Sequence, residues 1–270
     1  MLTDYHVHLR PDEDDSTAER YFTAGNVERY REAAEERGIE ELGVAEHIHR
    51  FVQSLDVWQH PWYRHWARDD IDEYCEFLRA SGLKVGIEAD FLPGREDRVQ
   101  NLLEAREWDY VVGSVHFVDG IPVDQAPGLV DELEVGDAWR RYFAWLREAA
   151  ASGLFDVLAH PDLVKIWGRR PSADETRHLH LEVADAVTEA GVCVEVSAAG
   201  LHKPVGELYP DAELLELCRE RGVPITLASD AHRPAHVGRD VVRAAALARG
   251  VGYETVTVFD ARERRQEPLG

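Results

Sequence analysis

The chain has 270 residues, of which 44% are hydrophobic and 30% charged, a composition typical of a folded globular protein. Aspartate and glutamate number 52 against 30 lysines and arginines, so the formal net charge is −22. Such a surface repels nucleic acids and anionic membranes. No stretch approaches the roughly 20 apolar residues of a membrane helix, and the N-terminal segment does not resemble a signal peptide. We therefore expect a cytoplasmic protein with no nucleic-acid or membrane partner.

Short apolar, β-branched runs alternate along the chain with longer amphipathic stretches. In chain order, strands are expected at residues 2–6, 41–47, 84–90, 110–116, 156–160, 192–197 and 224–229, with a further apolar run at 255–259. Helices are expected at residues 26–37, 69–81, 95–106, 137–151, 173–190, 211–221 and 239–249. Glycines follow six of these stretches, as helix C-termini favour. Buried strands that alternate with helices indicate a mainly parallel sheet.

The number of strand–helix repeats favours one closed architecture. Seven or so repeats in one chain suggest a barrel rather than an open sheet, although the right-handed crossover rule permits either topology. A single α/β barrel commonly needs roughly 250 residues, which this chain supplies. The sequence therefore predicts a single α/β barrel domain that spans residues 1–270.

Ionisable residues gather at the expected strand ends, which is where barrel proteins build their chemistry. His6 and His8 stand at positions i and i+2 of an extended segment, so both side chains point the same way. Six of the seven strands end in histidine, a carboxylate or both: His6 and His8; Glu46, His47 and His49; Glu88 and Asp90; His116; His160 and Asp162; Asp230 and His232. Imidazole and carboxylate ligands suit zinc, manganese or iron, and about eight of them would hold two or three divalent ions.

The remaining histidines do not follow this pattern. His178 and His180 lie in an expected helix, and His60, His65 and His236 lie in loops or near helix starts. We expect their side chains to be solvated rather than to bind metal.

Six motifs together resemble the PHP (polymerase and histidinol phosphatase) family, in matching order across nearly the whole chain. They are His6-x-His8, Glu46-His47, Gly86-Ile87-Glu88, Ser114-Val115-His116, His160-Pro161 and Ser229-Asp230-Ala231-His232. The resemblance implies a distorted (β/α)7 TIM-like barrel with a trinuclear metal centre. By resemblance to the family motifs, His6, His8, Glu88 and Asp230 would bind one ion. Glu88, His116 and His160 would bind the second ion, and His47 and His232 would bind the third.

The segment after the first histidine pair departs from the family pattern. Many members place another histidine there as a ligand of the third ion, whereas residues 10–15 read Arg-Pro-Asp-Glu-Asp-Asp. Carboxylates also bind these metals, so Asp14 or a neighbouring acid could replace the histidine. The alternative is that these acids are solvated loop residues.

Within the family, residues 160–165 and 197–204 resemble segments of the stand-alone histidinol-phosphatase-like members. The implied activity is that of a metal-dependent phosphomonoesterase acting on L-histidinol phosphate, a small phosphorylated substrate, in histidine biosynthesis. Bound divalent ions would lower the pKa of water and reverse the repulsion between an acidic protein and a phosphate. Three residues could orient the water or protonate the leaving alkoxide: Asp230, His232 and Asp162. Four could contact phosphate: Lys165, Arg169, His202 and Lys203.

Residues 50–68 follow the second strand and should hang over the active-site face. They contain three tryptophans, a tyrosine and three arginines, a composition that suits a substrate lid with Arg64 as a contact. A loop packed on its own aromatic side chains is the alternative.

Other functions remain open from the sequence. A PHP phosphoesterase could act on another substrate, such as a nucleotide or a phosphoprotein. An amidohydrolase-type metal hydrolase also opens with an HxH motif on a barrel strand, but that superfamily commonly uses a lysine at the end of a middle strand. A non-catalytic metal-binding scaffold is the remaining possibility.

Overall fold

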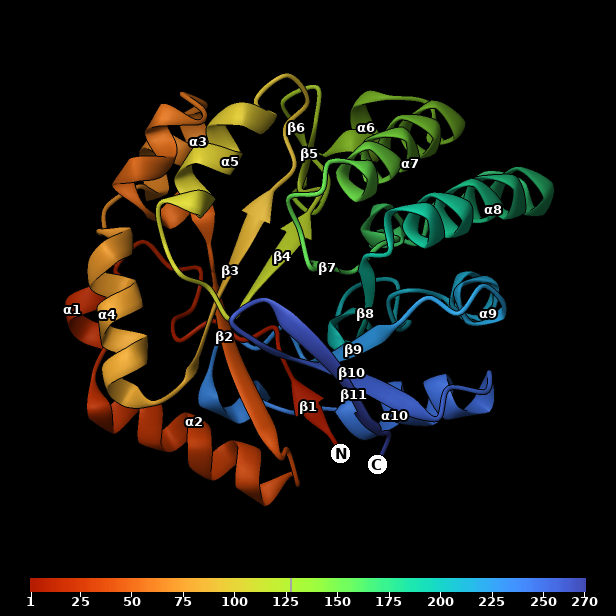
Figure 1. Cartoon of the computed structure of the whole chain (residues 1–270). Helices are drawn as coiled ribbons and strands as arrows, with labels where there is room; N and C mark the ends of the chain where they lie inside the picture. Colours follow the sequence, from red (N-terminus) through yellow and green to blue (C-terminus); the bar gives the residue numbers. More distant parts are fainter. Residues whose placement is uncertain (127) are drawn as a thin grey trace.

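The computed structural model describes residues 1–126 and 128–270 and contains seven parallel strands that curl into a nearly closed barrel (Figure 1). Along the sheet the strands are β1 (Thr3–Asp4), β2 (Glu41–His47), β3 (Lys84–Asp90), β4 (Tyr110–Ser114), β7 (Val157–Leu158), β8 (Cys193–Ser197) and β9 (Ile225–Ala228). A parallel bridge between Val7 and Ala231 joins the first and last of them. The His8 backbone N–H also donates to the Ala231 carbonyl at 2.7 Å. The predicted α/β barrel is confirmed.

The helices lie around the outside of the strands (Figure 1). Those that match predicted stretches are α2 (Ala24–Glu36), α4 (Ile71–Ser81), α5 (Glu96–Glu104), α7 (Val135–Ala151), α8 (Ala173–Ala190), α9 (Ala212–Glu220) and α10 (Val241–Gly250). Thr23, Asp70, Ser172 and Asp211 cap α2, α4, α8 and α9 with side-chain oxygens. Gly82 and Gly191 end α4 and α8 in the left-handed conformation that glycine adopts most readily.

Several short elements lie in segments that the sequence patterns leave as loops. They are α1 (Ala18–Tyr21), α3 (Pro61–Trp66), α6 (Leu129–Glu132) and the hairpin of β5 (Phe117–Val118) with β6 (Ile121–Pro122). In the part of the chain that the structure describes, no helix combines the length and the apolar character needed to cross a lipid bilayer.

The apolar run near the C-terminus is a strand but does not belong to the barrel. It forms β10 (Thr255–Asp260), which pairs antiparallel with β11 (Glu263–Pro268). The guanidinium of Arg262, in the hairpin turn, lies 2.9 Å from Asp156, which immediately precedes β7. The Phe259 backbone N–H donates to the hydroxyl of Tyr5 at 3.0 Å. The hairpin therefore lies at the end of the barrel from which the strands start, close to both termini (Figure 1).

An aromatic cluster fills the barrel interior beneath this hairpin. The rings of Tyr5 and Tyr110 meet edge-on with centroids 4.9 Å apart, and Phe259 of β10 packs against both. Gly86 of β3 makes room for Tyr110, because a Cβ there would lie 2.3 Å from its ring. This packing leaves only the opposite end of the barrel, where the strands finish, available for polar chemistry.

Candidate metal centre

Glu88, near the end of β3, stands at the centre of a buried ring of histidines. Its Oε2 atom lies 3.2 Å from Nε2 of His6 and 2.5 Å from Nδ1 of His47. Its Oε1 atom lies 3.2 Å from Nε2 of both His116 and His160. The four histidines follow or end different strands, so the parallel arrangement brings them to one edge of the barrel. The structure thus brings together residues that are up to 154 positions apart in the chain.

Asp230 adds a second carboxylate beside this ring. Its Oδ1 atom lies 3.5 Å from His8 Nε2, 3.8 Å from His6 Nε2 and 3.6 Å from His232 Nδ1. The backbone of Asp230 has a φ of 53°, and that of His160 has a φ of 26°. Non-glycine residues rarely adopt positive φ values. Residues that do so are concentrated at functional sites, where the surrounding structure enforces the strained backbone.

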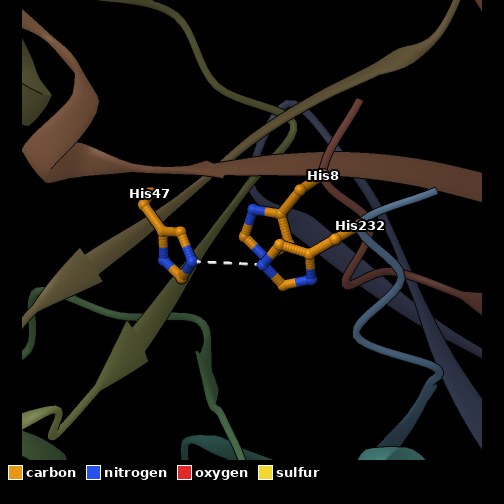
Figure 2. Close-up of side chains that lie close together, drawn as sticks. All are labelled: His8, His47 and His232. Carbon is orange, nitrogen blue, oxygen red and sulfur yellow. Dashed lines mark hydrogen bonds between the residues drawn. The ribbon is translucent and has the colours of Figure 1, made fainter. Parts of the chain in front are cut away.

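His8, His47 and His232 form a third group of side chains, which point toward one another (Figure 2). The ring of His8 stacks against both others, with centroids 4.2 Å apart in each case. His47 Nε2 and His232 Nε2 face one another at 3.4 Å (Figure 2). Two zinc–nitrogen bonds of about 2.0–2.1 Å at a tetrahedral angle would place the nitrogens roughly 3.3 Å apart. The observed spacing therefore fits a shared divalent ion.

Asp12 is the acid of the segment at residues 10–15 that reaches this third group. Its Oδ2 atom lies 3.0 Å from His232 Nε2. Burial raises the pKa of Asp12, but His232 and the Arg50 guanidinium outweigh it and hold that pKa well below its usual value. The side chain of Asp14 is instead 78% exposed and its carboxylate lies 2.7 Å from His65. Of the two acids, Asp12 is therefore the one that contacts this histidine group, and Asp14 does not.

Charge is tightly coupled across the ring. Burial lowers the pKa of His6, but carboxylates, Glu195 first, outweigh it and hold that pKa well above its usual value. Burial likewise lowers the pKa of His116, and Glu88 and Asp90 raise it well above normal. For His47 burial prevails and the pKa falls to about 4. The neighbouring carboxylates therefore favour positive charge on His6 and His116, whereas burial disfavours it on His47.

The buried atoms of the ring test whether these residues suit a metal. Among the described residues, no well-aligned hydrogen bond reaches Nε2 of His6, either ring nitrogen of His8 or Oε2 of Glu88, although Oε2 lies close to nitrogens of His6 and His47. Leaving buried polar atoms unpaired is unfavourable, and divalent ions would satisfy Nε2 of His6, Nε2 of His8 and Oε2 of Glu88. Four overlapping groups offer ligand atoms within 4.8 Å of one another: His6, Glu88 and His160; His6, His8 and Asp230; His47, Glu88 and His116; His8, His47 and His232. These donors fit divalent ions.

Two further carboxylates, not predicted as site residues, orient the histidines from behind. Glu195 Oε2 lies 2.8 Å from His6 Nδ1, and its Oε1 accepts a hydrogen bond from the His160 backbone N–H. Asp90 Oδ1 lies 2.8 Å from His116 Nδ1. Such contacts fix the ring orientation of a metal-binding histidine and increase its basicity. The sequence signal that could have predicted them is their position near strand ends, since Glu195 precedes the end of β8 and Asp90 ends β3.

Two of the residues predicted to act on the substrate pair with each other instead. Asp162 and Lys165 are fully buried, with Lys165 Nζ 2.7 Å from Asp162 Oδ2. Lys165 also donates to the Leu208 carbonyl at 2.7 Å. Arg169 donates to the Val130 carbonyl. Asp162, Lys165 and Arg169, which were predicted to act on the substrate, therefore bind other residues of the protein.

The other predicted contacts lie nearer the surface. Arg64 is exposed on α3 and donates to Gln59 at 3.1 Å. His202 and Lys203 line a pocket of about 330 Å³ together with metal-centre residues. The lining also includes Asp12, Asp230, His232, Arg233 and Arg239.

A narrower pocket of about 140 Å³ opens beside His47 and His116. Its remaining lining is mostly aromatic and acidic and comprises Asp12, His49, Trp62, Trp66, Phe117, Asp124 and Gln125. Trp62 and Trp66 come from α3, within the segment predicted as a lid, and their rings contact each other with centroids 5.8 Å apart. The aromatic side chains of this segment therefore pack together and also face the centre.

Comparison with known proteins agrees with this arrangement. The family model described as PHP domain matches residues 18–199. A Deinococcus radiodurans protein named "Probable histidinol-phosphatase" is 35% identical over 256 residues, covering 90% of this chain and 93% of that protein. A Schizosaccharomyces pombe protein of the same name is 26% identical, covering 79% and 77%.

A solved structure shares the fold across almost the full chain. It is a histidinol phosphate phosphatase from Lactococcus lactis in complex with zinc, L-histidinol and phosphate. The TM-score is 0.75 and the sequence identity 18%, with 98% of each chain covered. The family model, which matches more than half of the chain, and the Deinococcus relative agree with the motifs at the strand ends. The chain belongs to the PHP domain family.

Proposed function

We propose that this chain is a metal-dependent phosphomonoesterase that hydrolyses L-histidinol phosphate to L-histidinol and phosphate. The observation that carries the proposal is the ring around Glu88. Several of its buried nitrogen and oxygen atoms have no hydrogen-bond partner among the described residues, and its ligating atoms have the spacing of a divalent-ion site. The names of the Deinococcus and Schizosaccharomyces relatives, and the ligands of the Lactococcus structure, support the substrate.

We assign the metal ligands to three sets that draw on the four overlapping groups and on the contacts of Glu88 and Asp12. They are His6, His8, Glu88 and Asp230 for one ion, Glu88, His116 and His160 for the second, and His47, His232 and Asp12 for the third. Zinc, manganese or iron suits this mixture of imidazole and carboxylate. When bound, such ions polarise phosphoryl oxygens and activate water near neutral pH.

The pocket of about 330 Å³ is the proposed seat of the phosphate. Within it Arg233 contacts Glu13, and His202 lies 2.8 Å from Asp240. We assign Lys203 and Arg239 as the cations that meet the incoming phosphate in this otherwise acidic protein. Proton transfer falls to Asp230 and His232, because both line this pocket whereas Asp162 is buried against Lys165.

The aromatic pocket of about 140 Å³ suits the leaving alcohol. L-Histidinol carries an amine and an imidazole, both of which can be cationic. Trp62, Trp66 and Phe117 offer aromatic faces to a cation, and Asp124 offers a carboxylate. The pocket adjoins His47 and His116, so the alcohol could lie there while its phosphate reaches the metal centre.

Phosphate release tests the proposed reaction. Purified protein loaded with zinc or manganese is given L-histidinol phosphate, a panel of nucleotide and phosphopeptide esters, and a chelator control. We expect chelator-sensitive release from L-histidinol phosphate well above the panel. Release from another ester alone would retain the metal mechanism and reject the substrate. No release from any ester by metal-loaded protein would reject the phosphoesterase.

The aromatic pocket is tested by changing its acid. Asp124→Asn should lower kcat/KM for L-histidinol phosphate by roughly tenfold, because a charge-assisted contact contributes about 1.5 kcal/mol. Hydrolysis of p-nitrophenyl phosphate, whose leaving group is not cationic, should be unaffected. Asp119→Asn, in the exposed turn between β5 and β6, is the matched control. Equal losses on both substrates would place Asp124 outside the recognition of the leaving group.

A further inference from the structure

A second group of metal-ligating side chains lies outside the ring around Glu88. Asp162 follows β7, His180 lies on α8, and Asp211 caps α9. One ligating atom from each lies within 4.8 Å of the other two. The group therefore sits where the two outer helices meet the loop that follows β7.

The sequence pattern led us to expect a solvated His180, and that expectation is wrong. His180 is fully buried, because α8 packs this face against α7 and α9. Its Nδ1 atom lies 3.1 Å from Glu213 Oε2, whereas its Nε2 atom has no hydrogen-bond partner in the part of the chain that the structure describes. Nε2 faces Asp211 Oδ2 at 3.8 Å, which is too far for a hydrogen bond.

The two aspartates are held in the same way, with one oxygen engaged and the other available. Asp162 Oδ2 accepts hydrogen bonds from Lys165 Nζ and from the Asp211 backbone N–H, while its buried Oδ1 has no partner within residues 1–126 and 128–270. Asp211 Oδ1 accepts the capping hydrogen bond from the Leu214 backbone N–H at 3.0 Å. In each of the three side chains, one polar atom is held by a hydrogen bond and the other polar atom is available to bind a ligand.

The surrounding charges leave room for a cation. Lys165 contacts Asp162 and Glu207, Arg170 contacts Glu207, and Arg177 lies 2.6 Å from Glu213. Four carboxylates, Asp162, Glu207, Asp211 and Glu213, therefore face three permanent cations. Asp211 is the one whose ion-pair contact among the described residues is His180 alone.

We propose that Asp162, His180 and Asp211 bind a zinc ion that is separate from the centre around Glu88. Two carboxylate oxygens and one imidazole nitrogen suit zinc, with water as the fourth ligand. Glu213 orients the imidazole through Nδ1 and leaves Nε2 as the ligand, the usual arrangement of carboxylate, histidine and zinc. The ion would tie α8 and α9 to the loop that carries His160, two residues before Asp162. This proposal does not depend on the substrate proposed above.

Zinc content is the first test. Wild-type protein, His180→Gln and His178→Gln are loaded with zinc, freed of loose ions by buffer exchange and measured by elemental mass spectrometry. We expect one zinc ion fewer per chain in His180→Gln only. His178 is the matched control because it lies on the same helix but is 72% exposed. Equal zinc content in all three folded proteins would overturn the proposal.

Asp211→Asn and anomalous diffraction distinguish an ion from a buried water. Asparagine caps helices as well as aspartate does, so Asp211→Asn keeps α9 capped and removes only ligand charge. We expect it to lose the same zinc ion while circular dichroism remains that of the wild type. Crystals of zinc-loaded wild type should show an anomalous peak at the zinc edge between the three residues. Density there without anomalous signal would identify a water and reject the site.

Discussion

The two ends of the barrel are built from the same seven strands but carry different side chains. At the end where the strands start, the Arg262 guanidinium lies against Asp156, and the Tyr5 hydroxyl is hydrogen-bonded to Glu41 and the Phe259 N–H. At the end where the strands finish, His6 Nε2 and both ring nitrogens of His8 have no hydrogen-bond partner among the described residues. The first end is closed by packed side chains, whereas the second end presents side chains that can bind ligands.

This difference shows how one architecture divides stability from chemistry. Aromatic packing around Tyr110 stabilises the closed end without any ligand, since each large buried side chain contributes about 1.5–3 kcal/mol. The open end concentrates Glu88 and Asp230 among histidines at a cost in unpaired polar atoms. Substitutions at the open end should therefore affect metal content and turnover, and those at the closed end should affect unfolding.

The largest effect is expected for Glu88→Ala at the open end. Removing the carboxylate that contacts four histidines should empty the centre and lower turnover of L-histidinol phosphate by at least roughly 10²–10³-fold. Glu41→Ala, at the start of β2, should keep its metals and turnover. Metal analysis and phosphate release on both variants check this. Normal metal content in Glu88→Ala would contradict the assigned ligands.

Glu195→Gln should produce the next largest effect, because it weakens the partner of His6 without removing a ligand. Loss of such a supporting carboxylate typically lowers metal affinity or activity by about 10–100-fold. Competition with a chromophoric chelator measures the zinc affinity directly. Glu189→Gln, exposed near the end of α8, should behave as the wild type. If both variants bind zinc equally well, Glu195 does not support the centre.

Zinc binding should release protons at the open end. The pKa values of His6 and His116 are raised by neighbouring carboxylates, so both imidazoles hold protons at neutral pH in the metal-free protein. A ligand histidine must be neutral, so zinc affinity should fall about tenfold per pH unit for each proton displaced as the pH decreases. Titration calorimetry in two buffers of different ionisation enthalpy counts these protons. Identical heats in both buffers at pH 7 would exclude the coupling.

The smallest effect is expected at the closed end. Arg262→Ala removes the contact with Asp156 and should lower the free energy of unfolding by about 1 kcal/mol, since the guanidinium is partly exposed. Turnover and metal content should not change. Arg265→Ala, whose partner Glu267 lies on the same strand, is the control and should have little effect on either quantity. Chemical denaturation measures the difference. A loss of metal from Arg262→Ala would show that the two ends are coupled.

Local patterns in the sequence were sufficient to predict much of this molecule. The helix predicted at 173–190 and the strands predicted at 41–47 and 84–90 have the predicted bounds in the structure. The reason is that an amphipathic helix and a buried strand each have a characteristic pattern of apolar residues that repeats every few residues. The proximity of His6, Glu88 and Asp230 could be predicted from these elements, because the carboxyl ends of parallel strands meet at one end of a barrel.

Contacts between distant residues decided the rest. The run at 255–259 has the apolar character of a barrel strand, and only its pairing with β11 makes it part of a hairpin. Asp12 and Asp14 are equivalent in the sequence, and the path of the loop brings Asp12 to His232. His180 looks like a surface residue until α9 covers it. Loop paths and burial carry no periodic signal, so the sequence determined the elements and the ligand-bearing strand ends, and the tertiary structure chose the partners.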